Sequence, residues 1–325
     1  MSSHWHMSFP VFLGCVWLFV DIENLSDWLQ DDGTYYCNVR SVDAASFSLH
    51  DSVAEVKKDP TVPLLLQNAM INWDAFTTWR TRSEFLHRYG QVKVGVGVGF
   101  RISTRPNRDG LVYSWINDGA NIREKGAALQ LRTHFEKQAR AGVAPSLSIN
   151  DLAAYIRNRS LPYDTYSFTP VDDTVLNNVS ELHQLWSMIN GVRGNDNMGV
   201  LFGLGGKDSG VMFHTHKSAV SAVFAGHKRW LIYDEQLHGP DRAFLKKQLQ
   251  RAKRRNPSFL LNSMKAWIVN VLPMPEVQEW WHHAGWDCVQ GPGDLLFVPE
   301  GLHHGTINLD ETLSLSAQAI TLQRG

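Results

Sequence analysis

The sequence predicts a mainly β protein whose C-terminal part forms a sandwich or barrel and whose N-terminal part contributes helices. From Val200 onward, short strand-like runs alternate with turns rich in Gly, Pro and Asp, a pattern typical of sandwiches and barrels. Before this point, several segments space their apolar residues as helices do. The expected strands are 200–204, 211–216, 218–224, 229–234, 286–289, 295–298, 305–309 and 313–319.

Bulk composition is that of an ordinary globular protein. The 325 residues suffice for one large domain or two small ones. With 31 basic and 32 acidic residues, the formal charge is 31 − 32 = −1. This balance provides no electrostatic basis for binding nucleic acid or an anionic membrane. We therefore expect no nucleic-acid partner.

The first 22 residues are expected to form a signal peptide. Phe9 to Val20 is an apolar run, and no charged residue precedes Asp21. Twelve residues are too few to span a bilayer, which takes about 20, but they match the apolar region of a secretory signal. The mature chain is then expected to have no transmembrane span. The alternative is an N-terminal strand or helix packed on the core.

Residues 23–195 are expected to form a helical and strand region that packs on a core at 196–325. The glycine alternation at 95–99 lacks the spacing and the Lys-Ser/Thr pair of a phosphate-binding loop, so we interpret it as part of a strand. Residues 241–268 are helical and basic and are expected to be a helical insert with a solvated face. In the N-terminal region we expect helices at 43–55, 76–89, 126–141, 152–156 and 179–189, and strands at 63–67 and 91–100.

The three cysteines are Cys15, Cys37 and Cys288. If the leader is removed, Cys15 is removed with it. The remaining pair could form one disulfide in an oxidising compartment or stay as two buried thiols. The sequence leaves both possibilities open.

Histidines beside strand-like runs are the main candidates for chemistry. In a strand, residues i and i+2 share a face, so His214 and His216 are expected to point the same way. A third imidazole from His303-His304, on a distant strand, could complete one face of a metal site and leave positions open for substrate and O₂. Taken alone, a His-x-His pair is more often an ordinary surface or core feature.

Three motifs in order make this region resemble a JmjC domain of the cupin superfamily. They are His-Thr-His at 214–216, GHKRW at 226–230 and GDLLFVP at 293–299, which leads into HHGTINLD at 303–310. The chain is most similar to small JmjC-only proteins of the Jumonji domain-containing protein 8 type, which also carry His-x-His. The resemblance implies a double-stranded β-helix (jelly-roll) core.

The resemblance also implies a set of metal ligands. His214 matches the first ligand of the family, and His304 matches the last because it lies five residues after Pro299. His303 is the second choice for that role. His216 stands where the iron oxygenases have an acid, so the implied site for Fe(II) or another divalent metal consists of three neutral histidines.

Lys228 matches the family residue that binds the distal carboxylate of 2-oxoglutarate. The alternative is a strand lysine whose ammonium reaches water. Family members often support that carboxylate with a Thr or Ser three residues before the first ligand, and here Val211 occupies the place.

Two functional hypotheses follow from the resemblance. The first is an Fe(II)/2-oxoglutarate-dependent oxygenase of the protein hydroxylase type, acting on a protein in the endoplasmic reticulum lumen or secretory pathway. The second is an inactive JmjC-fold scaffold or regulatory protein that binds a protein partner. A different three-histidine cupin enzyme and a cytoplasmic location are further alternatives. The oligomeric state cannot be derived from the sequence.

Overall fold

The computed structural model describes residues 36–95, 97–98, 137, 146–157, 165–170, 175, 179–190, 198–234, 247–248, 250–251, 254 and 264–319. The expected signal peptide, the 126–141 helix apart from residue 137, and most of the basic insert lie outside these residues. Within them, no helix is long and apolar enough to cross a membrane.

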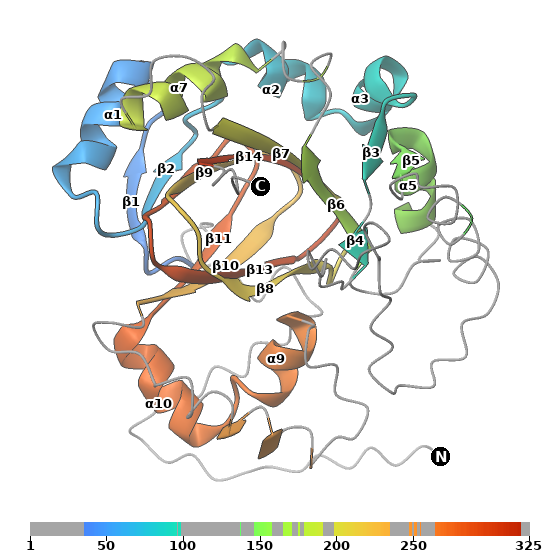
Figure 1. The fold of residues 1–325 in the computed structure, drawn as a ribbon. Coiled ribbons are helices and arrows are strands. Elements are labelled where there is room, and N and C mark those ends of the chain that lie inside the picture. The colour runs from blue at the N-terminus through green and yellow to red at the C-terminus, as the bar shows by residue number, and fades with distance from the viewer. Residues whose placement is uncertain are drawn as a thin grey trace, which may run out of the picture.

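Two β-sheets face each other and form the core (Figure 1). The larger sheet has the strand order β1-β2-β12-β9-β14-β7-β6-β4, and the smaller has β11-β10-β13-β8. The expectation of a mainly β, jelly-roll core with flanking helices is confirmed. The large sheet contains β1 (Arg40–Asp43), β2 (Leu64–Gln67), β4 (Gly97–Val98), β6 (Thr165–Pro170), β7 (Met198–Gly205), β9 (Ala219–Ala225), β12 (Leu295–Val298) and β14 (Thr312–Ala319); the small sheet contains β8 (Gly210–His214), β10 (Lys228–Tyr233), β11 (Gly285–Gln290) and β13 (His303–Asn308).

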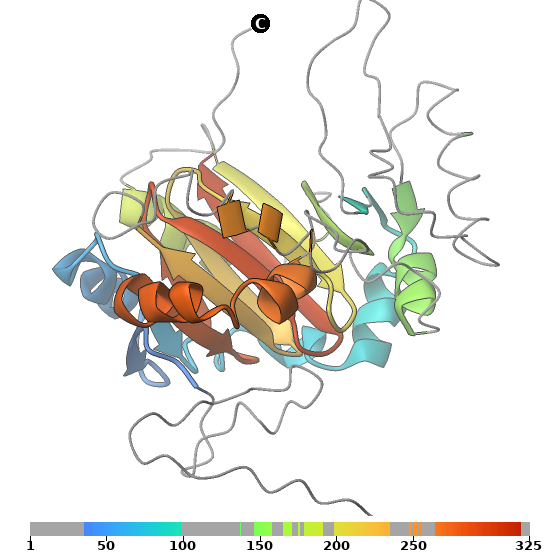
Figure 2. The ribbon, with the colours of Figure 1, turned by 90° about the horizontal axis from the view of Figure 1, so that it is seen from below.

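Helices cover the outer faces of both sheets. Figure 1 shows α1 (Leu49–Lys58), α2 (Asp74–Trp79) and α7 (Ser180–Asn190) on the large sheet. Figure 2 shows α9 (Met264–Asn270) and α10 (Pro275–Ala284) lying across the small sheet. The helix expected over 76–89 is divided into α2 and α3 (Arg82–Tyr89), and α5 (Ile149–Arg157) follows the short pair β3 (Lys93–Gly95) and β5 (Ser146–Ser148).

Local sequence signals explain where these helices begin. Ser48 caps α1, because its hydroxyl accepts the Asp51 N–H while the Asp51 carboxylate accepts the Ser48 N–H. This reciprocal pair satisfies two backbone donors that a helix start leaves open. The Ser148 hydroxyl accepts the Asp151 N–H at the start of α5 in the same way. Helix α1 therefore begins six residues later than the 43–55 helix expected from the sequence.

The apolar core has three parts. One packs the large sheet against its covering helices and includes the fully buried Trp79, Trp186 and Phe202. A second packs the outer face of the small sheet against α9 and α10. The third fills one end of the space between the sheets with Trp230, Leu296 and their neighbours. The other end of that space is polar, and it contains the candidate site.

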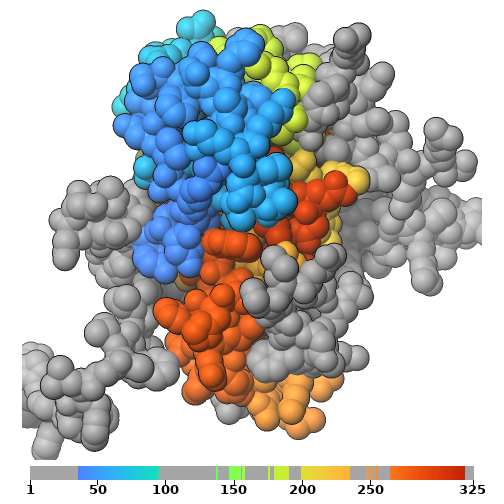
Figure 3. Space-filling model, turned by 90° about the vertical axis from the view of Figure 1, so that its left-hand side faces the viewer, coloured from blue at the N-terminus to red at the C-terminus, as the bar shows by residue number. Residues whose placement is uncertain are grey.

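The first residues that the structure describes, from Tyr36 on, are bonded to the edge of the small sheet formed by β11. Cys37 forms a bridge pair and a disulfide with Cys288 of β11, with 3.9 Å between their Cα atoms. The Asn38 N–H donates to the Asp287 carbonyl, and Arg229 holds the Asp287 carboxylate through two hydrogen bonds. Figure 3 shows the first described residues in blue beside the C-terminal elements in orange on this face. Of the two open possibilities for the cysteines, the structure has the disulfide.

Candidate metal centre

A cavity lies between the two sheets at their polar end. Its volume, counted as the space that the centre of a water molecule can occupy, is about 40 Å³. Strands of both sheets line it, so residues far apart in sequence meet there. The lining is Gly203, Leu204, Gly205, Gly210, Val211, His214, His216, Ala219, Ser221, Lys228, Trp230, His304, Thr306, Asn308, Ser314 and Ser316.

A β-bulge in β8 directs His214 into the cavity. His304 lies opposite His214, but Thr306 lies opposite Val211, so β8 contains one extra residue between these pairs. Met212 and Phe213 instead pack against the cluster under α9 and α10. Val211 and His214 thus both line the cavity although they are three residues apart, which simple alternation would not allow.

His216 reaches the cavity from a turn and not from a strand. The expected strand over 211–216 was too long, because β8 ends at His214 and His216 lies in the connection to β9. The Gly301 N–H donates to the His216 carbonyl at 3.2 Å. An ion pair between Lys217 and Glu300 joins the same two turns. These contacts hold the turn where the His216 ring meets the other two.

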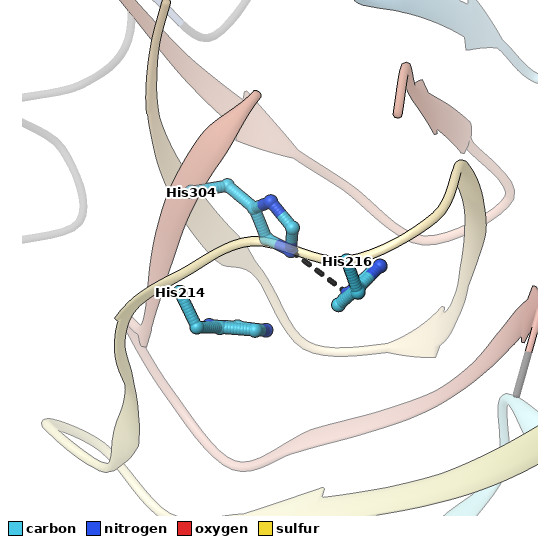
Figure 4. A group of neighbouring side chains, drawn as sticks. All are labelled: His214, His216 and His304. Carbon is cyan, nitrogen blue, oxygen red and sulfur yellow. Dashed lines mark hydrogen bonds between the residues drawn. The ribbon is translucent and has the colours of Figure 1, made fainter. Parts of the chain in front are cut away.

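The three imidazoles of His214, His216 and His304 converge (Figure 4). One ring nitrogen from each lies within 4.8 Å of the others, which is close enough for a single metal ion. Nε2 of His304 is 3.1 Å from Nε2 of His216. The ring centroids of His214 and His304 are 4.3 Å apart.

Hydrogen bonds to backbone carbonyls set the tautomer of each ring. The Nδ1 atoms of His214, His216 and His304 donate to the carbonyls of Met212, Lys217 and Leu302, respectively. A carbonyl can only accept, so Nδ1 carries the proton in each neutral ring and Nε2 keeps its lone pair.

Burial keeps these rings neutral. It is the main cause that lowers the pKa of His214 to about 4, and it also lowers the pKa of His216 and, strongly, that of His304. Two lone pairs that face each other at 3.1 Å repel unless a cation lies between them. The donor set therefore fits a divalent metal that accepts imidazole.

His303 does not join this group. Its ring stacks on Tyr233 with 5.0 Å between centroids and 9° between planes. Neighbours on a strand point to opposite faces, so His303 lies on the outer side of β13 and His304, 3% exposed, on the inner side. The geometry thus favours His304 over His303 as a ligand.

Lys228 extends into the cavity rather than toward water. The residue is 8% exposed, and its Nζ donates to the Ser314 hydroxyl at 2.8 Å. Burial lowers the pKa of its ammonium to about 8. In the part of the chain that the structure describes, no carboxylate forms an ion pair with Lys228. Such a buried cation is costly without an anion.

Hydroxyl and amide groups complete the polar wall, and the sequence argument had not identified them. They are Ser221 on β9, Ser314 and Ser316 on β14, and Thr306 and Asn308 on β13. A signal was present in the sequence, because Ser314 and Ser316 alternate with apolar residues within 313–319. Alternation alone could not reveal that this face of β14 points to a cavity.

Comparison with known proteins agrees with this architecture. Residues 203–318 match the family model described as "JmjC domain, hydroxylase". JmjC domain-containing protein 8 of Mus musculus is 28% identical over 116 residues, which cover 35% of each chain. The Homo sapiens protein is 28% identical over 118 residues, covering 35% of this chain and 36% of its own. The match thus spans about a third of these relatives. Residues 203–318 of this chain, which include all three histidines and Lys228, are a JmjC domain.

Proposed function

We propose that this protein is an Fe(II)/2-oxoglutarate-dependent oxygenase of the protein hydroxylase type with a three-histidine metal site. The observation that carries the proposal is the convergence of three Nε2 lone pairs and one buried ammonium on a single cavity. An inactive scaffold has no need for this arrangement, since a plugged cavity or an outward-pointing Lys228 would serve it equally well.

Three side chains would hold the metal, and a fourth would hold the co-substrate. His214, His216 and His304 present Nε2 to a common point, with their rings fixed by backbone carbonyls. Lys228, supported by Ser314, would receive the distal carboxylate of 2-oxoglutarate. Bound Fe(II) would supply the activation of O₂.

The walls of the cavity have a role besides ligation. Trp230 lines the cavity beside His304, with 5.9 Å between ring centroids, and its indole N–H donates to the buried Gln290. This hydrogen bond fixes the indole ring against the site. A rigid aromatic wall limits the water that can reach the metal and orients whatever enters.

The proposed substrate is a protein side chain in the secretory pathway. The Cys37–Cys288 disulfide supports this compartment, because disulfides persist in oxidising environments and are rare in the cytosol. The identity of the substrate protein is left to experiment.

Anaerobic titration with Fe(II) and 2-oxoglutarate tests the proposal. The wild type should develop a visible metal-to-ligand charge-transfer band, and His214→Ala should not. His303→Ala is the matched control, because His303 stacks on Tyr233 outside the cavity, and it should keep the band. If the wild-type protein develops no band, whether Fe(II) or 2-oxoglutarate is added first, the oxygenase function is refuted and the scaffold is favoured.

A further inference from the structure

The charge of the cavity stays positive even when its proposed ligands are counted. The residues that line it include Lys228 and three neutral imidazoles but neither Asp nor Glu. Glu300, in the turn beside His216, pairs instead with Lys217. A divalent metal and the Lys228 ammonium together exceed the charge of a dianionic co-substrate by one. An acid at position 216 would remove this excess, so His216 is the residue that leaves the site positive.

A side chain that enters beside the metal is therefore sorted by its charge. Charges interact more strongly in an enclosed cavity of low polarity than in water. Taking a cation out of water without a partner anion is also costly. The ammonium of a lysine or the guanidinium of an arginine would meet an excess of positive charge here and no described carboxylate. The cavity thus disfavours cationic side chains.

Two buried hydroxyls face the cavity without a partner. Ser221 of β9 and Ser316 of β14 line the cavity and lie directly opposite each other in the strand register. They are only 1% and 6% exposed. Among the residues that the structure describes, neither hydroxyl forms a hydrogen bond. Buried hydroxyls are normally satisfied, so these two are available to a group that enters the cavity.

The two hydroxyls lie toward the metal end of the cavity. Ser314, nearer the start of β14, holds the Lys228 ammonium, and Ser316 lies two residues, or about 7 Å, farther along the strand. Its partner Ser221 lies on β9, which begins shortly after His216. Ser221 and Ser316 thus form a polar patch that is separate from the Lys228 end.

We infer that the substrate of this site is a neutral carboxamide side chain, as in asparagine, and that His216 is the specificity-determining residue that excludes lysine and arginine. The inference rests on the proposed function, because it names the substrate class of the same site. A carboxamide donates and accepts hydrogen bonds, as a hydroxyl does, so it can pair with Ser221 and Ser316 without adding charge. An aliphatic side chain of the same size would leave both hydroxyls unpaired.

An acidic side chain would offset the positive charge by another route. Carboxylates bind divalent metals directly, so an acid would take a position on the metal that the co-substrate needs. It would then compete with 2-oxoglutarate, whereas a carboxamide would bind beside it. This difference makes the two classes of side chain distinguishable by experiment.

Proton NMR of capped amino acids measures these preferences without turnover. The full-length protein is loaded with Mn(II) and saturating 2-oxoglutarate, and Mn(II) broadens the lines of any probe whose side chain comes close to it. The probes are N-acetyl, N-methylamide derivatives, which share their backbone amides and differ only in the side chain. The His214→Ala variant gives the broadening that is caused by Mn(II) outside the site.

Two matched pairs of probes separate the hydroxyls from the charge. Asparagine should bind more tightly than leucine, its apolar counterpart in size. Methionine should bind more tightly than lysine, which adds a charge at similar length. We expect each preference to be roughly tenfold or more. Aspartate should release 2-oxoglutarate, which equilibrium dialysis detects, and asparagine should not.

Variants should change the two preferences independently. The double variant Ser221→Ala and Ser316→Ala should lose the preference for asparagine but still discriminate against lysine. His216→Asp should do the reverse, because the new carboxylate cancels the excess charge. His216→Asn, which matches Asp in size without its charge, should still discriminate against lysine. His303→Asp should do so too, because His303 stacks on Tyr233 outside the cavity.

The outcomes separate this inference from the proposed function. If Mn(II) and 2-oxoglutarate bind but no probe is broadened, or lysine binds as tightly as methionine, or asparagine binds no more tightly than leucine, the inference is overturned and the oxygenase proposal stands. Aspartate that binds more tightly than asparagine without releasing 2-oxoglutarate would also overturn it. A wild-type protein that binds neither Mn(II) nor 2-oxoglutarate would overturn both. If a variant fails to fold, the preferences of the wild type still decide the question.

Discussion

Replacing Lys228 by methionine is expected to stabilise the ligand-free protein while it weakens the proposed binding of 2-oxoglutarate. Methionine keeps the length and the apolar stem of the lysine but removes the buried ammonium. Two opposite effects on one variant are a strong test, because a lysine with a purely structural role would lose stability when replaced.

The magnitude follows from the pKa of the ammonium. Burial lowers this pKa from 10.5 to about 8, and each pKa unit corresponds to about 1.36 kcal/mol. The charged form therefore costs about 3 kcal/mol at pH 7. Loss of the hydrogen bond from Lys228 to Ser314 lowers the free energy of unfolding of the variant by about 1–2 kcal/mol. The net gain in free energy of unfolding for Lys228→Met is about 1–2 kcal/mol.

The gain in free energy of unfolding for Lys228→Met should decrease as the pH rises. Because the folded-state pKa lies below the unfolded one, the unfolded wild type binds more protons between about pH 8 and pH 10.5. The wild type therefore becomes more stable across this range relative to the variant. The advantage of Lys228→Met should be full at pH 7 and should shrink as the pH rises through 8.

Urea denaturation at pH 7 and pH 9.5, without metal or dicarboxylate, measures both effects. Lys217→Met is the matched control, because the Lys217 side chain is 53% exposed and its replacement should change stability little at either pH. The affinity for 2-oxoglutarate in the presence of metal should fall about 10- to 100-fold in Lys228→Met. A Lys228→Met protein that is less stable than the wild type by the same amount at both pH values would refute the reasoning.

Two further predictions concern the frame around the site. Removing the Cys37–Cys288 disulfide, which joins residues 251 apart, should lower the free energy of unfolding by about 2–4 kcal/mol. In urea denaturation, both single serine variants and the double variant should lose similar amounts of stability, because each change breaks the same bond. Losses that add up in the double variant would contradict a shared bond. Gly210→Ala should weaken Mn(II) binding. A Cβ at this position would lie 1.9 Å from the Thr306 carbonyl oxygen, so β8 would have to move away from β13. A Cβ at the control position Gly291 would lie no closer than 3.4 Å to any neighbouring atom. Equal Mn(II) affinities for Gly210→Ala and the control Gly291→Ala would contradict the role of that strand contact.

Much of the strand content could be predicted because it depends on local patterns. The strand over 295–298 has the expected bounds, and the expected strands at 200–204 and 313–319 differ from β7 and β14 by one or two residues. These strands combine dense apolar residues with clear turn signals at their ends. The strand β13 begins at His303, two residues before the expected 305, because the two histidines add no apolar signal of their own.

Long-range features of the site could not be predicted from pattern alone. The pairing of β2 with β12 joins residues more than 200 apart, and nothing in a local window encodes such a partner. The bulge in β8 depends on contact with β13 and with the helices α9 and α10, so simple alternation placed His216 on a strand that in fact ends at His214. The three histidines lie together in the structure, but a turn and not a strand face brings His216 to the others.

The position of His216 on a turn helps to explain how a histidine can stand where iron oxygenases have an acidic residue. An imidazole is longer than an aspartate side chain, and a strand would hold its Cα at a fixed depth in the cavity. A turn can set the backbone at a different depth, and here the contacts of Gly301 and Glu300 with the His216–Lys217 turn fix that position. The neutral imidazole and the turn contacts are thus parts of one arrangement, and weakening either should loosen the proposed metal before it affects Lys228 at the far end of the cavity.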